Sequence, residues 1–194
     1  MRGFTIIEIL ISVSIFAVVM VIALGALLMM SESNRRAEAL KSVINNLNFS
    51  LDSMTRAIRT GGYYDCTLGA VPLSENHLTA GNAEDCPPGG ATKFAFETAE
   101  NVTIVYCRGN AKPTPVCSNS GVAILRSVQG AALQAITSPE VQITNFKFYV
   151  RGAPAGDSTQ PIVSVLLSGL VKASGNANSV FNIQTSATQR IYDQ

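Results

Sequence analysis

The chain has 194 residues, of which 47% are hydrophobic and 14% are charged, whereas charged residues average about 25% in soluble proteins. Its 14 basic and 13 acidic residues give a net charge of +1, and no basic run is longer than Arg35-Arg36. These totals argue against nucleic acid as the main partner, because phosphate binding needs clustered Lys and Arg. The length suits one globular domain beside a separate N-terminal segment.

The first element in chain order is an apolar segment at residues 9–30. These 22 residues carry no charge, and Ser12, Ser14 and Gly25 are the exceptions to their apolar character. About 20 residues are enough to cross the hydrocarbon core of a bilayer, so the segment predicts a membrane-spanning helix. A cleaved secretory signal peptide is not expected, since the apolar run is long, only Arg2 precedes it and no A-x-A site follows.

A helical pattern continues beyond the apolar segment. Apolar residues recur mostly three or four positions apart, at Leu40, Val43, Ile44, Leu47, Leu51, Met54 and Ile58. The pattern stops at Gly61-Gly62, which is a typical helix end. We therefore predict one long helix over residues 4–60. Its first part, residues 4–30, would lie in lipid or against other helices, and its second part would pack on the chain's own globular domain.

Residues 61–194 predict a globular head that is rich in β-strands. The strand candidates are 93–97, 101–107, 122–128, 141–151, 162–173 and 181–191. The apolar alternation changes phase within 141–151, which predicts a β-bulge near Asn145. Residues 162–171 are mostly apolar on both faces, so we expect this strand at the centre of its sheet, with the helix packed over that sheet. One helix followed by a run of strands predicts an α+β fold with an antiparallel sheet.

The four cysteines, Cys66, Cys86, Cys107 and Cys117, all follow the apolar segment. Their even number favours two disulfides in an exported head. Of the three possible pairings, the sequence-local one joins Cys66 to Cys86 and Cys107 to Cys117 and is geometrically the simplest. Four reduced structural cysteines are the alternative. The disulfide between Cys107 and Cys117 would close a loop over residues 108–116, which would serve either stability or contact with a partner.

The sequence contains no recognisable catalytic or metal-binding motif. Its single histidine, His77, lies in a polar loop near Ser74 and Glu75, and no G-x-S-x-G, phosphate-binding loop or H-E-x-x-H is present. The acidic loop residues, Asp65, Glu84, Asp85 and Asp157, lack the spacing of a calcium loop, although calcium binding stays an alternative. We expect no enzymatic activity, no cofactor, no metal and no small-molecule ligand.

The front of the chain resembles the type IV prepilin family, which includes pilins and the pseudopilins of type II secretion. The resemblance rests on GFTIIE at positions 3–8, followed by the long apolar helix. It implies that a prepilin peptidase cuts between Gly3 and Phe4, which makes residues 1–3 a leader, and that Phe4 is then N-methylated. NFSLDSMTRAIRTG at 48–61 and FNIQTSATQR at 181–190 are similar to J-type minor pseudopilins and W-type minor pilins. The fold implied is type IV pilin-like.

Within this resemblance, Glu8 is the family's characteristic acid, at the fifth position after cleavage. An ionised carboxylate in hydrocarbon costs several kcal/mol unless it is paired. Cleavage would create an amine at Phe4, and the amine of a neighbouring subunit would neutralise Glu8 and fix the register of assembly. The alternative is that Glu8 reaches the lipid headgroups.

The expected protein is therefore a single-pass protein of the inner membrane that later joins a pilus or pseudopilus. Its expected partners are other pilin or pseudopilin subunits, the prepilin peptidase and the inner membrane. Arg35, Arg36 and Lys41 would place the head in the cytoplasm by the positive-inside rule, whereas the cysteines and the polar head favour the outside; we follow the cysteines. The alternatives are a binding module at the filament tip, for a surface, substrate or DNA, and a membrane-anchored enzyme.

Overall fold

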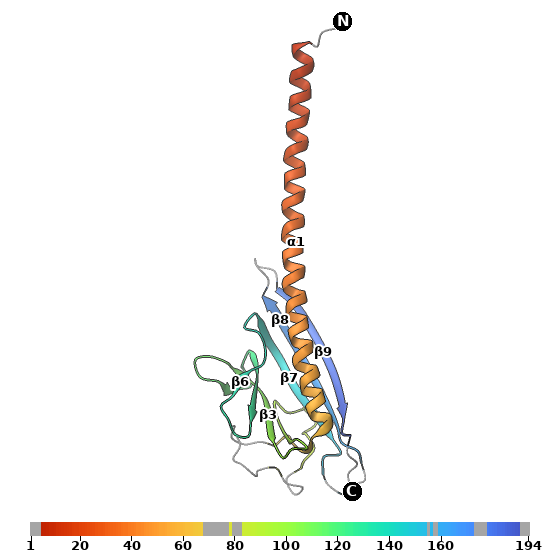
Figure 1. Cartoon of the computed structure of the whole chain (residues 1–194), viewed down its shortest axis with the longest axis vertical. Helices are drawn as coiled ribbons and strands as arrows, with labels where there is room; N and C mark the ends of the chain where they lie inside the picture. Colours follow the sequence, from red (N-terminus) through yellow and green to blue (C-terminus); the bar gives the residue numbers. More distant parts are fainter. Residues whose placement is uncertain are drawn as a thin grey trace. The chain divides into compact units, whose positions relative to one another are not determined.

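The computed structural model describes residues 5–67, 78, 83–154, 156, 159–172 and 178–190. Within these residues it contains one helix and nine strands, shown in Figure 1. They are α1 (Ile6–Thr60), β1 (Gly62–Asp65), β2 (Lys93–Glu97), β3 (Thr103–Asn110), β4 (Val116–Cys117), β5 (Ala123–Val128), β6 (Gln134–Ala135), β7 (Val141–Arg151), β8 (Ile162–Lys172) and β9 (Asn178–Thr188). The predicted α+β fold is confirmed. The chain divides into two compact units, an N-terminal unit (Met1–Lys41) and a head (Ser42–Gln194).

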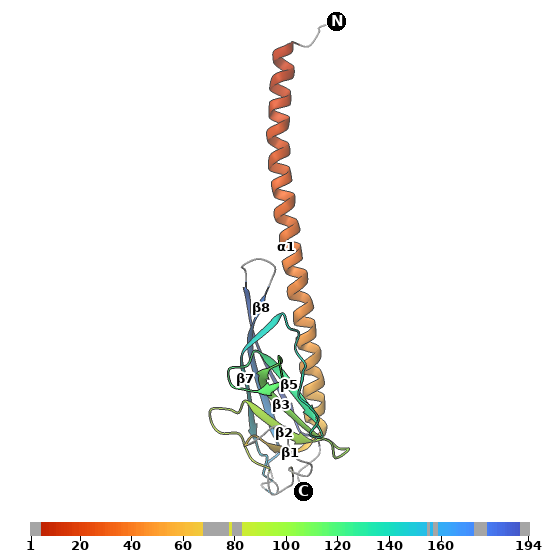
Figure 2. The same cartoon turned by 90° about the vertical axis from the view of Figure 1, so that its left-hand side faces the viewer.

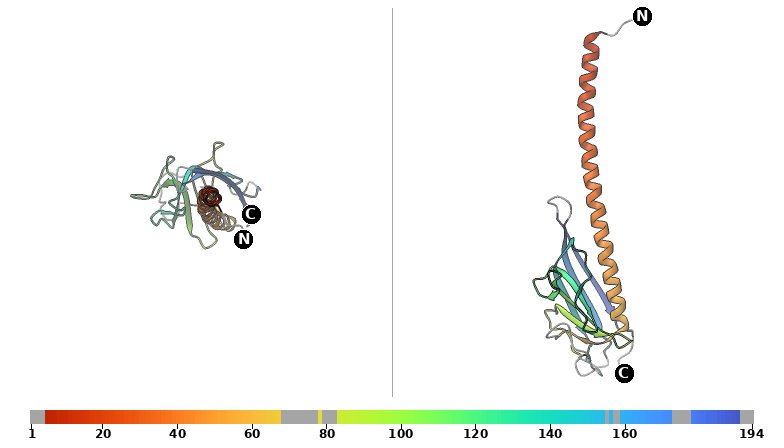
Figure 3. Two further views of the ribbon diagram at one scale, coloured as in Figure 1. Left: turned by 90° about the horizontal axis from the view of Figure 1, so that it is seen from above. Right: turned by 60° about the vertical axis from the view of Figure 1, so that its left-hand side comes forward.

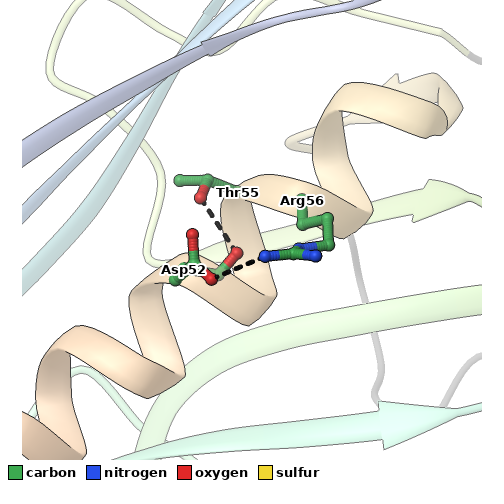
Figure 4. Close-up of polar contacts among 3 residues, drawn as sticks. All are labelled: Asp52, Thr55 and Arg56. Carbon is green, nitrogen blue, oxygen red and sulfur yellow. Dashed lines mark hydrogen bonds and ion pairs between the residues drawn. The ribbon is translucent and has the colours of Figure 1, made fainter.

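Residues 42–60 of α1 form the helical part of the head. The buried side chains follow a spacing of three or four and lie on one face: Val43, Leu47, Leu51, Met54 and Ile58. The opposite face is polar. Arg56 Nη2 donates to Asp52 Oδ2 at 3.1 Å, and Thr55 Oγ1 donates to the Asp52 carbonyl oxygen at 3.1 Å (Figure 4). Because both charged side chains are mostly exposed, this ion pair contributes little to stability.

α1 ends at Thr60, directly before the glycine pair. A Cβ atom at position 61 would lie 2.5 Å from Phe96 Cδ2 and 2.8 Å from the Glu97 carbonyl oxygen, so this close approach requires glycine. The buried Tyr64 hydroxyl then closes the helix end, 2.6 Å from the Ile58 carbonyl oxygen and 3.0 Å from that of Gly61. Its single proton donates to one of these carbonyl oxygens at a time, and Ile58 is among the last four helical residues, whose carbonyl groups have no intrahelical partner.

The head strands form two antiparallel sheets, whereas the sequence predicted one. The first has the order β1-β2-β3-β5-β6, with β4 paired to β3, and the second has the order β7-β8-β9. Figure 2 shows β1, β2, β3 and β5 together in one layer, and Figure 1 and Figure 3 show β8 and β9 beside the head part of α1. The two sheets meet at a backbone bridge, in which Ala91 N lies 2.9 Å from Phe148 O and Phe148 N lies 2.8 Å from Ala91 O.

All six predicted strands are present, with shifted ends for four of them. The strands predicted at 93–97 and 141–151 have the observed bounds, whereas β3 and β9 are displaced from the predicted 101–107 and 181–191. The pairing of β7 with β8 shifts register between Ile143 and Asn145, which confirms the predicted bulge. β8 lies between β7 and β9, as expected. Its second face is not buried, however, because Leu166 and Leu170 are only half-buried there.

Aromatic rings from both sheets share the core of the head. The buried rings of Tyr64, Phe94, Phe96, Tyr106, Phe146 and Phe148 form a chain of contacts with centroid separations between 4.7 and 6.3 Å. The contact that joins the sheets is between Phe94 of β2 and Phe148 of β7, at 4.8 Å. Aromatic pairs contribute about 0.5–1.5 kcal/mol each beyond the area that they bury, so this chain helps to hold the two sheets together.

Two disulfides are present in the head, with the sequence-local pairing. Cys66 and Cys86 are joined with their Cα atoms 5.0 Å apart, and Cys107 and Cys117 with theirs 5.7 Å apart. The second bridge links β3 to the short strand β4, so residues 108–116 form a loop that is closed by both a disulfide and strand pairing.

Candidate functional site

The candidate functional site is the apolar segment of α1, in the N-terminal unit, taken together with the first helical turn that carries Glu8, so that it covers residues 6–30. All of its large apolar side chains are exposed, with exposed fractions that range from 46% at Met20 to 81% at Ile6. An amphipathic surface helix has one apolar stripe, whereas this segment is apolar on every side. By length and composition, it is enough to cross a membrane. Its surface therefore suits lipid or the apolar faces of other helices.

The two serines of the apolar segment are satisfied within the helix. Ser12 Oγ donates to the Glu8 carbonyl oxygen at 2.7 Å, and Ser14 Oγ donates to the Ile11 carbonyl oxygen at 2.8 Å. Hydroxyl groups that bond back to the preceding turn need no partner from their surroundings. Neither serine is therefore an obstacle to an apolar environment.

Glu8 is the one charged side chain of the apolar segment, and it lies exposed in the first turn of α1. Because α1 begins at Ile6, Thr5 and Glu8 stand at the N-cap and third helical positions and match the sequence of a capping box. The Glu8 amide donates to the Thr5 carbonyl oxygen at 3.1 Å. An acid at this end of a helix gains about 0.3–1 kcal/mol from the helix dipole. Burying an ionised carboxylate in hydrocarbon costs several kcal/mol. The dipole alone therefore does not make Glu8 tolerable there.

A cationic partner for Glu8 is missing from the part of the chain that the structure describes. The ion pairs among those residues are Glu32 with Arg36 and Asp52 with Arg56, both at 3.1 Å. In an apolar environment, Glu8 thus requires either the membrane surface or a cation from elsewhere. Gly3 and Phe4, the predicted cleavage and methylation positions, lie outside the described residues, so both modifications stay predictions.

Two of the acidic residues considered for calcium, Asp65 and Asp85, form hydrogen bonds within the head. Asp65 Oδ1 accepts hydrogen bonds from Thr67 N at 2.6 Å and Thr67 Oγ1 at 2.8 Å, and Asp85 Oδ1 accepts one from Ala153 N at 2.8 Å. Among the described residues, no group of three or more His, Cys, Asp or Glu side chains is placed to hold a metal ion. Asp157 lies outside the described residues.

The described residues contain none of the three side chains that the sequence offered for catalysis. His77, together with Ser74 and Glu75, lies outside the described residues. All four cysteines, which the structure does describe, are joined in disulfides, so none of them is a free thiol.

The structure also brings together two residues that the sequence did not single out. Phe49 of α1 and Arg126 of β5 line one groove of the head. The sequence could have indicated Phe49, because it is a large apolar residue outside the apolar stripe to which Leu47 and Leu51 belong. The sequence could not have indicated Arg126, because its neighbours depend on how β5 pairs with β3 and β6.

Comparison of the chain with protein-family models, with curated proteins and with solved structures finds no match. The function proposed for it therefore rests on its own residues.

Proposed function

We propose that the chain is a structural subunit, and a minor one, of a type IV pilus or a type II secretion pseudopilus. In this proposal a prepilin peptidase removes residues 1–3 and Phe4 is N-methylated. The subunit is first held in the inner membrane by its helix, with the head outside the cytoplasm, and then joins the filament through the same helix. The observation that supports this function is a helical segment, exposed and apolar on every side, with a single acid in its first turn.

The same helical surface serves both stages because both surroundings are apolar. Lipid surrounds the segment before assembly, and helices of neighbouring subunits surround it afterwards, where close packing replaces lipid contacts. Glu8 then selects the alignment. Four residues of helix rise correspond to about 6 Å, so a neighbour displaced by about 6 Å along the helix axis presents its Phe4 amine level with Glu8. Other displacements leave the carboxylate unpaired.

The first test of this function is processing of the N-terminus. The full chain is co-expressed with a prepilin peptidase, and its intact mass is measured by mass spectrometry. We expect the mass to fall by that of residues 1–3 and to rise by one methyl group, and the Gly3→Val variant to keep the unprocessed mass. An unchanged mass for the native chain, alongside normal processing of a known prepilin in the same cells, would contradict the proposal.

The second test concerns Glu8 and has a matched control. Glu8→Gln keeps the size and shape of the side chain but removes its charge and replaces one acceptor oxygen by an NH2 donor, whereas Ser12→Ala removes a hydroxyl that is satisfied within the same segment. We expect normal processing of both variants. Glu8→Gln should enter sheared filaments at least about tenfold less than the native chain, the equivalent of about 1.4 kcal/mol, and Ser12→Ala should enter normally. Normal incorporation of Glu8→Gln would contradict pairing with a neighbour and would favour either the headgroup role or pairing with the subunit's own amine.

A second candidate function is a binding module at the filament tip, and the stapled loop favours it. Residues 112–114 are exposed, Val116 is 55% exposed, and the disulfide between Cys107 and Cys117 holds both ends of the loop. Replacing Lys112, Pro113 and Thr114 by glycine leaves the disulfide intact. For a binding module, filaments should still form but lose adhesion, secretion or uptake. Retention of all these activities would remove this candidate.

A further inference from the structure

One long strand edge of the head has no neighbouring strand among the described residues. β9 is the last strand in the order β7-β8-β9, so one of its sides pairs with β8 and the other faces away from the sheet. All eleven of its residues, Asn178–Thr188, pair with β8 in sequence and without a register shift. In Figure 1, β9 runs along the border of the head. The edge is therefore long and regular.

The hydrogen bond between Gln189 and Pro161 shows which backbone groups of β9 face this edge. Gln189 N donates to the Pro161 carbonyl oxygen at 3.0 Å, directly beyond the last residue pair of β8 and β9. In an antiparallel pair, residues that bond to the neighbouring strand alternate with residues whose N–H and C=O groups point away from it. The residues that point outward are therefore the even-numbered ones: Val180, Asn182, Gln184, Ser186 and Thr188. Among the described residues, no backbone group bonds to them on that side.

The other strand edges of the head are short or covered. On the opposite edge of the same sheet, Phe148 of β7 exchanges two backbone hydrogen bonds with Ala91. In the first sheet, the edge strand β6 has only two residues, and Glu84 N donates to the Tyr64 carbonyl oxygen of the edge strand β1 at 3.0 Å. Native sheets avoid unwanted pairing by such short or covered edges. β9 is the exception.

The sequence of β9 also lacks the usual protection of an open edge. Native edge strands often contain lysine or proline, or a bulge that twists the edge away. β9 reads NSVFNIQTSAT, with no charged residue and no proline, and its unbroken register excludes a bulge. The ligand that matches such an edge is an extended backbone, because its own N–H and C=O groups alternate with the same period. The edge therefore suits an added strand.

The end of α1 beside this edge is basic. Arg190 follows β9, and its N–H donates to the Arg59 carbonyl oxygen at 2.8 Å. A cleft of about 370 Å³ is lined there by Asp52, Thr55, Arg56, Arg59, Thr60 and Arg190. Asp52 pairs with Arg56, whereas Arg59 and Arg190 form no ion pair with a described residue. Three arginines and one aspartate leave an excess of positive charge next to the place of an added strand.

This charge distinguishes between two kinds of added strand. A second copy of β9 would bring no acidic side chain, because β9 contains none. A strand with acidic side chains on the face that looks toward α1 would neutralise the two arginines. Exposed ion pairs contribute little each, so the backbone hydrogen bonds supply most of the affinity and the charges select the partner. The charge favours an acidic strand from a different protein.

We propose that the open edge of β9 binds an extended segment of another protein, which adds a strand to the sheet and carries acidic side chains toward Arg59 and Arg190. The backbone of this segment bonds to the outward N–H and C=O groups of residues 180–188. The inference does not depend on the filament proposal, since it uses the head alone.

Amide hydrogen exchange tests the edge residue by residue. It is measured by NMR on the full chain in detergent micelles. Without a ligand, the outward amides of Asn182 and Gln184 should exchange at least about tenfold faster than those of Phe181 and Ile183, which bond to β8. Equal protection of the two sets would show that the edge is already covered and would overturn the proposal.

The probe for binding is the peptide N-acetyl-Thr-Glu-Val-Glu-Val-Glu-Thr-amide, whose acids lie on one face of an extended strand. Its matched neutral control has glutamine in place of each glutamate. Kd is measured from the shifts of the backbone amide resonances. At saturation with the glutamate peptide, exchange at residues 182, 184 and 186 should slow at least about tenfold, and Kd for the glutamine peptide should be at least about threefold higher.

Three variants separate the backbone contribution from the charge. Gln184→Pro removes one outward N–H, which an edge strand tolerates, and should weaken binding at least about tenfold. Gln184→Thr keeps this N–H and should bind like the native chain. The double variant Arg59→Gln with Arg190→Gln should bind the two peptides equally, because the difference between them depends on those charges.

Four outcomes would overturn the proposal. They are unchanged exchange at residues 182, 184 and 186 with the glutamate peptide, equal binding of the two peptides by the native chain, native binding by Gln184→Pro, and protection without peptide that rises with protein concentration. The last would identify a second copy of the chain as the occupant. If Gln184→Pro does not fold, the exchange pattern and the two peptides decide the question on the native chain alone.

Discussion

Tyr64→Phe removes one hydroxyl group from the end of α1 and leaves the ring in place. That oxygen lies 2.6 Å from the Ile58 carbonyl oxygen and 3.0 Å from that of Gly61, and the side chain is 1% exposed. In the variant, Ile58 O still accepts a hydrogen bond from Gly61 N at 3.1 Å, whereas Gly61 O loses its bond to Tyr64. An acceptor left unsatisfied in a buried place costs about 1–3 kcal/mol.

This cost is measurable as a loss of thermal stability. For a domain of about this size, 1 kcal/mol changes Tm by about 2–4 °C, so we expect Tyr64→Phe to lower Tm by about 2–12 °C. The assay is thermal unfolding of the full chain in detergent micelles, followed by near-UV circular dichroism. Tyr63→Phe is the matched control, because the neighbouring Tyr63 is 46% exposed and its loss of a hydroxyl should change stability by less than about 0.5 kcal/mol. A Tm for Tyr64→Phe equal to that of Tyr63→Phe would refute this account of the helix end.

Three further predictions concern the head. Burial raises the pKa of Tyr64 and of Tyr106 above the ordinary value of 10.0, so the unfolded chain loses these two protons at a lower pH than the folded chain. The stability of the head is therefore full below about pH 10 and falls above it. With rising pH, the urea midpoint should fall less steeply for Tyr64→Phe than for the native chain. Replacing both cysteines of the 107–117 disulfide by serine should lower the free energy of unfolding, measured with urea, by about 2–4 kcal/mol. An unchanged free energy of unfolding would show that this disulfide does not stabilise the head. Gly169→Ala places a Cβ atom 2.6 Å from both the Gln142 carbonyl oxygen and Phe181 Cζ and should cost about 1–3 kcal/mol, whereas native stability would show that the strand backbone and the ring both move aside at little cost.

The helix and the long strands were predictable because their signals are local. The stripe from Val43 to Ile58 has the helical period, and the glycine pair after Thr60 marks the end that the structure has. The phase change around Asn145 is equally local, since a bulge inserts one residue into an otherwise regular alternation. In each case the burial pattern of consecutive residues carries the information.

The short strands and the division into two sheets were not predictable in the same way. β4 and β6 have two residues each, which is too few to show any alternation, and they exist because β3 and β5 offer them a pairing edge. The two sheets are joined at a bridge between Ala91 and Phe148, residues that are far apart in the sequence. The groove has the same origin, because strand register brings Arg126 opposite Tyr106.

The sequence singles out Glu8 by its position, and the other acids of α1 sharpen the question of its partner. Glu32 and Asp52 each pair with an arginine four residues later, at Arg36 and Arg56. The matching position after Glu8 is Ser12, whose hydroxyl is already bonded to the Glu8 carbonyl oxygen. The helix therefore supplies an internal partner to two acids of its polar half and none, at that spacing, to the acid of its apolar half.

The cation that this proposal offers to Glu8 is the amine that cleavage would create at Phe4. Two such amines could pair with Glu8: that of the same subunit and that of a neighbouring subunit. If its own amine neutralised Glu8, the processed monomer would already be satisfied. Glu8→Gln would then remove a contact within one subunit and leave incorporation into filaments unchanged. If the neighbour's amine is the partner, the variant should be processed normally and incorporated at least about tenfold less, because the correct alignment loses its advantage over others. Normal processing combined with lost incorporation thus assigns the partner to the neighbouring subunit.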